Sequence, residues 1–279
     1  MSAAPLEAFT RRRVAGLAAA VLRDAGVEGV LPTPMEAVRR AAGIRALADV
    51  SELPAPPPPG FGRVLGAYWY ERRTAFVAAG EPEPRRRFTD AHEITHALCP
   101  WHGDTLRLDD AATLDGRVRD QIEAEANFGA AHLIFQGARF HAEAAGHGVS
   151  LRAPLALAER YGASRHAALH FYTDEHPEPV ALLVAGRWPQ RDGTLPIWSS
   201  VESRSFLARH GRLAGRLTRL DGEFGELLDA ARHTSDPPAA SVRIGGRRFA
   251  AEAYYNRHCH FVLVAERQAL PSAVRARSA

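Results

Sequence analysis

The spacing of apolar residues predicts helices and a hairpin in the first third of the chain. Residues 6–25 have apolar side chains at helical intervals, and residues 34–42 start with proline and stop at a glycine, so both segments are predicted to be helices. Residues 66–80 contain two short apolar runs around a charged tripeptide, which predicts a β-hairpin. The proline-rich residues 52–62 are expected to be a loop, because proline fits neither a helix interior nor a central strand.

Two further helices are predicted after the hairpin. The helix that contains residues 92–96 must stop before Pro100, since proline breaks a helix interior. Residues 115–135 follow as a long second helix. Its apolar face consists mostly of small residues: Ile122, Ala126, Gly129, Ala130 and Leu133.

Residues 150–173 are predicted to form two short helices around Gly162, with Ser164 as the N-cap of the second. This spacing is typical of a helix-turn-helix, in which Arg165 and His166 would begin a DNA-recognition helix. We favour the alternative that the pair is a helical subdomain, which packs on its neighbours or docks a protein partner.

The pattern becomes strand-like after residue 177. One helix is predicted at 203–220 among five predicted strands, at 180–186, 195–200, 241–246, 247–255 and 260–266. We therefore expect an α+β protein with three domains, at 1–148, 149–177 and 178–279.

The sequence HEITH, at residues 92–96, carries the most specific chemical signal. On a helix, His92 and His96 are four positions apart and face the same way, so both imidazoles can bind one zinc ion. Glu93 stands beside them, where its carboxylate can take a proton from the attacking water and deliver it to the leaving amine. The pattern predicts a zinc peptidase site. A surface helix with incidental histidines is the alternative.

His102 is one candidate for the third metal ligand, because it stands where the metzincin pattern HExxHxxGxxH has its last histidine. Cys99 occupies the glycine position of that pattern, where the turn favours a residue tolerant of positive φ. The methionine turn of that class is also missing, since the last methionine of the chain is Met35. We therefore disfavour the metzincin interpretation.

A glutamate on the second helix is the other candidate, as in gluzincins. Glu123 and Glu125 lie about 200° apart around the helix, so both cannot face the metal. We favour Glu123, because Asn127 follows it by one turn and the small-residue face lies nearby. The Asn127 amide can hydrogen-bond a liganding histidine and fix its tautomer.

Residues 85–98, RRRFTDAHEITHAL, followed by EAEANFGAAHLI at 123–134, resemble the ImmA/IrrE family of zinc metallopeptidases. The similarity extends over residues 60–180 and is strongest to the radiation-response branch. The chain departs from the family pattern at Leu133–Gln136, where relatives commonly have LLMP, and at Cys99–His102. These departures concern substrate selection more than the metal site.

The resemblance implies a gluzincin-like peptidase domain in which His92, His96 and Glu123 bind zinc and Glu93 is the general base. It also implies a GAF-like C-terminal domain and a particular substrate class. Relatives cut a helix-turn-helix repressor once and thereby switch on a response to stress such as DNA damage. Manganese is the alternative metal, because two histidines and a carboxylate accept both ions.

Two other functions remain open from the sequence. A regulator that binds DNA or a repressor without cutting it would have no need of Glu93. A peptidase that serves as an antitoxin or immunity partner of a mobile element would be distinguished by its neighbouring genes.

Composition adds little to this picture. The chain has 279 residues, a net charge of +3 and arginine at every basic position. We favour codon bias over a nucleic-acid surface as the explanation of its pI of about 9.2, because such a surface would need the charges clustered on one face. Its two cysteines lie far apart, and neither a signal peptide nor a run of about 20 apolar residues is evident. We expect a cytoplasmic protein that does not bind membranes.

Overall fold

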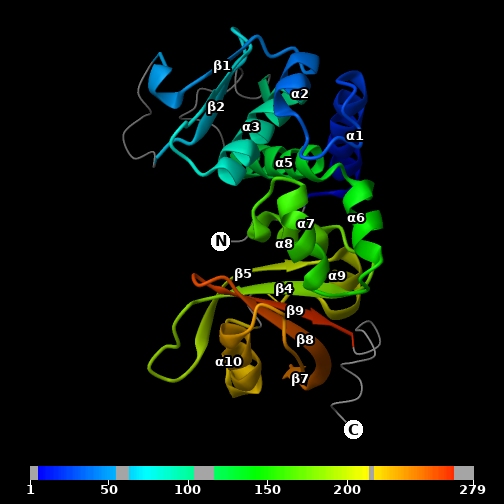
Figure 1. The fold of residues 1–279 in the computed structure, drawn as a ribbon, viewed down its shortest axis with the longest axis vertical. Coiled ribbons are helices and arrows are strands. Elements are labelled where there is room, and N and C mark those ends of the chain that lie inside the picture. The colour runs from blue at the N-terminus through cyan, green and yellow to red at the C-terminus, as the bar shows by residue number, and fades with distance from the viewer. Residues whose placement is uncertain (1–5, 55–62, 104–115, 214–216, 267–279) are drawn as a thin grey trace. The chain divides into compact units, whose positions relative to one another are not determined.

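The computed structural model describes residues 6–54, 63–103, 116–213 and 217–266, which form two compact units (Figure 1). One unit comprises the described residues up to Arg139 together with Glu159–Ser164. The other comprises Phe140–Ala158 and the described residues from Arg165 onward. The division into three domains stays a prediction.

A three-stranded sheet with the order β1-β3-β2 lies in the first unit. β2 (Gly66–Trp69) and β3 (Thr74–Val77) are the predicted antiparallel hairpin, and β1 (Ala46–Ala48) pairs parallel with β3. A short 3₁₀ helix, η1 (Val50–Glu52), follows β1. Most of the predicted proline-rich loop lies outside the described residues. β2 is an edge strand of this sheet, and it lies beside the helix that carries the HEITH sequence.

Helices form the rest of the first unit. Those that matter for the site are α3 (Glu83–Leu98) and α5 (Gly116–Phe135), and α5 lies close to its predicted bounds. α1 (Ala8–Asp24) packs against α5, and α2 (Met35–Ala41) packs against α1 and α3. The helix α3 starts after Pro82, and it ends before Pro100 as predicted.

α3 and α5 cross at a point where neither helix has a bulky side chain. A Cβ atom on Gly129 of α5 would lie 2.3 Å from Thr95 Cγ2 of α3, so the two backbones approach too closely for any larger residue. The predicted apolar face of α5 is confirmed, since all five of its positions are buried. This close crossing sets the distance between the side chains of α3 and α5.

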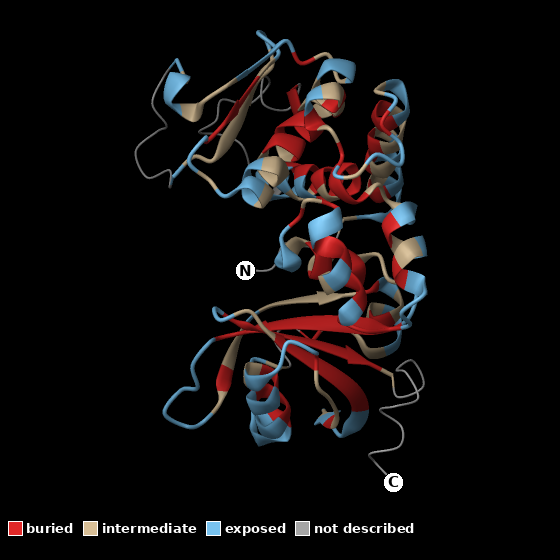
Figure 2. Cartoon of the chain, in the orientation of Figure 1, coloured by how far each residue is buried: buried red, intermediate tan, exposed pale blue. Residues whose placement is uncertain are grey.

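The second unit contains a six-stranded antiparallel sheet with the order β6-β5-β4-β9-β8-β7. Every residue of the central strands β4 and β9 is buried, because helices cover both faces of the sheet (Figure 2). The strands are β4 (Val180–Ala185), β5 (Leu195–Glu202), β6 (Arg219–Leu220), β7 (Ala239–Ile244), β8 (Arg247–Tyr255) and β9 (His260–Ala265).

Different helices pack against the two faces of this sheet. α9 (Arg204–His210), the 3₁₀ helix η2 (Gly222–Phe224) and α10 (Gly225–His233) contribute to one core, with Phe206 and Leu227 against Leu183 and Val262. α8 (Arg165–Asp174) packs on β4 and β5. It follows α7 (Arg152–Arg160) across a turn in which Gly162 has a φ of +62°, so the predicted helix pair is confirmed.

One predicted element differs from the structure, and some elements were not predicted. The helix expected at 203–220 ends at His210, because Gly211 takes a φ of +72°, and Arg219 and Leu220 form a strand instead. α6 (Ala138–Ala145) and α10 were not predicted. All five predicted strands are present.

Candidate metal centre

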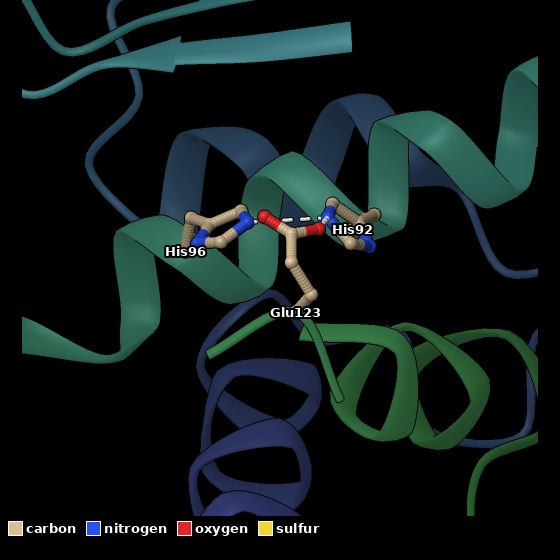
Figure 3. A group of neighbouring side chains, drawn as sticks. All are labelled: His92, His96 and Glu123. Atoms are coloured by element: carbon tan, nitrogen blue, oxygen red, sulfur yellow. Dashed lines mark hydrogen bonds and ion pairs between the residues drawn. The ribbon is translucent and has the colours of Figure 1, made fainter. Parts of the chain in front are cut away.

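His92 and His96 project from the same face of α3, one turn apart (Figure 3). Their Nε2 atoms are 3.1 Å from each other. The helix supplies this arrangement by itself, since residues four apart stand above one another. His96 is buried and His92 is partly buried, so both rings are fixed by their surroundings.

Glu123 projects from α5 towards the two rings (Figure 3), and its Oε2 atom is 3.3 Å from His92 Nε2. One ligand atom from each of the three side chains lies within 4.8 Å of the others. Ligand atoms that bind zinc at about 2.0–2.1 Å in a tetrahedron are about 3.3 Å apart, so the three side chains fit a zinc ion. They form the only such group of histidine, cysteine or acidic side chains found in the described parts of the chain.

Asn127 accounts for the orientation of His92. Its Oδ1 atom is 3.1 Å from His92 Nδ1, and an amide oxygen can only accept a hydrogen bond. His92 Nδ1 therefore donates, and the lone pair is left on Nε2, which faces Glu123 and His96. The structure thus brings together all four of the side chains expected to bind or orient a metal: His92, His96, Glu123 and Asn127.

His102 and Glu125, the two rival ligand candidates, both lie outside this group of three. His102 Nδ1 contacts His96 Nδ1 at 3.0 Å, which is the edge of the ring that faces away from His92. Glu125 Oε2 accepts hydrogen bonds from His102 Nε2 at 3.0 Å and from Trp101 Nε1 at 2.7 Å. Sequence reasoning considered these residues only as ligands and missed that they contact each other.

Glu93 lies between the histidines and the edge strand β2. Its side chain is buried, and a Cβ atom on Gly66 of β2 would lie 2.4 Å from its Oε1 atom. Burial raises the pKa of Glu93 to about 8, with the charge of His92 opposing the shift and that of Glu123 adding to it. A carboxyl whose pKa lies near neutrality can both accept and return a proton.

The charges of the site favour a neutral His96 and an ionised Glu123. Burial, together with the charges of the nearby His92 and His102 rings, lowers the pKa of His96 to about 3. The adjacent His92 ring lowers the pKa of Glu123, and it does so when His92 Nε2 carries a proton that it can donate to the carboxylate. A neutral imidazole and a carboxylate are the forms in which these side chains bind a metal.

Tyr70, in the turn after β2, was not singled out in the sequence. Its hydroxyl is buried and has no hydrogen-bond partner among the residues that the structure describes. Burial raises the pKa of Tyr70, and the charges of Glu93 and Glu123 add to the shift. The position of this residue beside the HEITH helix depends on how the hairpin packs, so no local motif could have marked it.

Comparisons with known proteins concern the part of the chain that contains this site. Residues 59–173, which include the HEITH helix and Glu123, match the family model described as the IrrE N-terminal-like domain, a peptidase family. The resemblance to the ImmA/IrrE family that was inferred from the sequence is therefore confirmed over these residues.

Two particular proteins show how far the similarity extends. The chain is 33% identical to the radiation response metalloprotease IrrE of Deinococcus deserti over 132 residues, which are 47% of this chain and 47% of that protein. The match therefore spans about half the length of that curated relative. A solved Mycobacterium tuberculosis transcriptional regulator has a similar fold, with a TM-score of 0.59 and 16% identity over 91% of this chain and 76% of that one. None of the described helices is long and apolar enough to cross a membrane.

Proposed function

We propose that the chain is a zinc-dependent endopeptidase that cuts a specific protein substrate. The observation that carries the proposal is the convergence of two histidines and a glutamate from α3 and α5, with Glu93 buried beside them. A site built only for binding would have no need of a buried carboxylate next to the ligands.

The metal is held by His92, His96 and Glu123 in this proposal. When bound, zinc acts as a Lewis acid that polarises the substrate carbonyl and makes water more acidic. Manganese is the alternative ion, because nitrogen and carboxylate ligands accept both. The hydrogen bond between His92 Nδ1 and Asn127 keeps His92 in the tautomer that can bind either ion.

Glu93 serves as the general base and then as the general acid. It takes a proton from the attacking water and delivers that proton to the leaving amine as the peptide bond breaks. Its position between α3 and β2 fits this role, because it faces both the metal ligands and the strand beside which a substrate would lie.

The substrate binds in an extended conformation along β2. An edge strand can pair with a peptide through main-chain hydrogen bonds, and β2 lies beside α3. Tyr70 follows β2 directly, and its hydroxyl, which no described residue hydrogen-bonds, would donate to the polarised carbonyl oxygen.

The substrate class we propose is a helix-turn-helix transcriptional repressor, cut once to switch on a response to stress such as DNA damage. The family resemblance supports this class, and the relative from Deinococcus deserti is named for a radiation response. We place the reaction in the cytoplasm, where the unpaired thiols of Cys99 and Cys259 would stay reduced.

DNA binding by the α7–α8 pair is the less favoured function. The guanidinium of Arg165, at the start of the would-be recognition helix, hydrogen-bonds the Tyr254 hydroxyl of β8. An arginine whose guanidinium already hydrogen-bonds another residue of the protein is poorly placed to bind DNA bases. The GAF-like assignment of residues 178–279 also remains a proposal, supported by the six-stranded antiparallel sheet.

A comparison of the wild type with Glu93→Gln tests the proposed activity. Both zinc-loaded proteins are incubated with a peptide library prepared from a bacterial proteome, and new N-termini are identified by mass spectrometry. We expect a small set of related cuts with the wild type and none with the variant, although both carry zinc. Equal cleavage by the two proteins would contradict the role of Glu93. The helix-turn-helix protein encoded nearest to the gene is the first intact substrate to test.

A further inference from the structure

His96 is the first of three side chains that are linked by hydrogen bonds. The other two, His102 and Glu125, lie on the side of His96 away from the other metal ligands. His96 Nδ1 is 3.0 Å from His102 Nδ1, and His102 Nε2 is 3.0 Å from Glu125 Oε2. Trp101 Nε1 and Gln121 Nε2 also donate to Glu125, at 2.7 and 3.0 Å. The carboxylate therefore has a donor at both of its oxygens.

The direction of each hydrogen bond follows from the carboxylate end. An ionised carboxylate can only accept, so His102 Nε2 must carry a proton and donate it to Glu125. In a neutral His102 ring, Nδ1 then has a lone pair and accepts. His96 Nδ1 must donate to it, which leaves the lone pair of His96 on Nε2, the atom that faces His92 and Glu123.

All three side chains that form these hydrogen bonds are buried. His102 is 0% exposed, Glu125 is 3% exposed and His96 is 8% exposed. Water has little access to compete for these donors and acceptors, so a broken link would leave a buried polar atom without a partner. The segment that brings His102 and Trp101 here, residues 100–103, is helical and begins at Pro100, directly after α3.

We propose that His102 and Glu125 are positioning residues for the metal site, which hold His96 in the tautomer and orientation that bind the ion. This inference rests on the proposed function only in that the site binds a metal. His92 has a different arrangement, since the exposed Asn127 hydrogen-bonds its Nδ1 atom. The two histidines of the HEITH sequence are thus oriented by different means, and the pair of residues that the sequence offered as rival ligands instead orients a ligand.

Two substitutions of one residue separate the two hydrogen bonds of His102. In His102→Asn, the amide oxygen stands near the place of Nδ1 and can still accept from His96, whereas the link to Glu125 is lost. In His102→Gln, the amide nitrogen stands near the place of Nε2 and can still donate to Glu125, whereas the link to His96 is lost. Both changes put a neutral amide into the same buried space.

The measurement is the zinc affinity of the metal-free full chain, determined by competition with a chromophoric chelator. We expect His102→Gln to bind zinc about 10–100-fold more weakly than the wild type, the usual effect of losing the group that orients a ligand. His102→Asn should keep most of the wild-type affinity. His147→Asn, which changes an exposed histidine in the second unit, is the control and should bind as the wild type does.

Glu125→Gln is a second variant that retains the volume of the side chain, in case both His102 variants fail to fold. It removes the charge but keeps an oxygen acceptor, so we expect an affinity between those of the wild type and His102→Gln. In the zinc-loaded wild type, side-chain ¹H–¹⁵N spectra should show a slowly exchanging proton on His96 Nδ1. That proton should exchange rapidly in His102→Gln.

Each outcome bears on one claim. Equal affinities in the wild type, His102→Gln and Glu125→Gln would overturn the positioning role, as would an equal loss in His102→Gln and His102→Asn. A wild type that binds no zinc would overturn both this inference and the proposed peptidase. The expected order of affinities in a protein that cuts no peptide would support the positioning role and contradict the peptidase.

Discussion

At the scale of single residues, Glu93 is confined between α3 and the backbone of β2. A methyl group at Gly66 would lie 2.4 Å from Glu93 Oε1 and 2.4 Å from Thr89 Cγ2. Gly66→Ala should therefore displace the carboxylate while the metal ligands stay in place. We expect kcat/KM to fall by about 100-fold, because a misplaced catalytic group loses most of its effect.

Zinc content and melting temperature, measured beside activity, decide whether this loss is local. Gly80→Ala is the matched control, since a Cβ atom there has no neighbour within 4 Å. Its activity should equal that of the wild type. A fully active Gly66→Ala protein would show that Glu93 is free to move without consequence.

Tyr70 provides a second prediction at this scale. Removal of a buried hydroxyl without a partner should leave the free energy of unfolding of Tyr70→Phe unchanged or raise it by about 1 kcal/mol. If the hydroxyl donates to the substrate, turnover should fall about tenfold or more, with zinc content unchanged. Urea denaturation and kcat are the two measurements. A variant that is less stable but fully active would assign Tyr70 a structural role.

The sequence predicted part of the site because helical geometry is local. The four-residue spacing of His92 and His96, and of Glu123 and Asn127, already places each pair on one helix face. The role of Glu125 could not be predicted, because its partners His102 and Trp101 come from another part of the chain.

At the scale of elements, the crossing of α3 and α5 holds the ligands of the two helices together. Gly129→Ala should destabilise the protein by about 1–3 kcal/mol, because the new methyl group would meet Thr95 at 2.3 Å and Val14 at 3.0 Å. The measurement is the free energy of unfolding by urea. Gly16→Ala, on the exposed side of α1, is the control and should be neutral or slightly stabilising. Equal stability of the two variants would mean that the helices can separate easily.

Elements were predicted well where one periodicity persists and poorly where glycine interrupts it. The strands of the second unit are continuous apolar runs, which the sequence reveals directly. The segment 203–220 has helical spacing throughout, but Gly211 adopts a left-handed conformation and ends the helix at His210. α10 follows an Asp221-capped 3₁₀ turn, a start signal that we did not use.

At the scale of the whole molecule, a buried carboxylate of the second unit links β8 to the segment before α7. Glu252 of β8 accepts hydrogen bonds from the Ser150 hydroxyl at 2.9 Å and from the Leu151 backbone N–H at 2.7 Å, directly before α7. Burial nevertheless raises the pKa of Glu252, with these hydrogen bonds opposing the shift.

This shift gives the second unit a pH dependence whose sign can be worked out. A raised pKa means that the folded protein binds the proton of Glu252 more tightly than the unfolded chain does. The free energy of unfolding of the wild type, relative to Glu252→Gln, should therefore fall as the pH rises from about 4 towards neutrality. Urea denaturation of both proteins at several pH values measures this difference. A difference that is constant or grows with pH would contradict the assignment.

The central claim concerns the metal, and zinc content tests it most directly. The full chain, its Glu93→Gln and Glu123→Ala variants, and Asp120→Ala as a control on an exposed position of α5, are loaded with zinc, desalted and analysed by mass spectrometry. We predict about one zinc per chain in the wild type, Glu93→Gln and Asp120→Ala, and little or none in Glu123→Ala. A Glu123→Ala protein that retains its zinc, or a wild type that binds none, would contradict the site described for His92, His96 and Glu123.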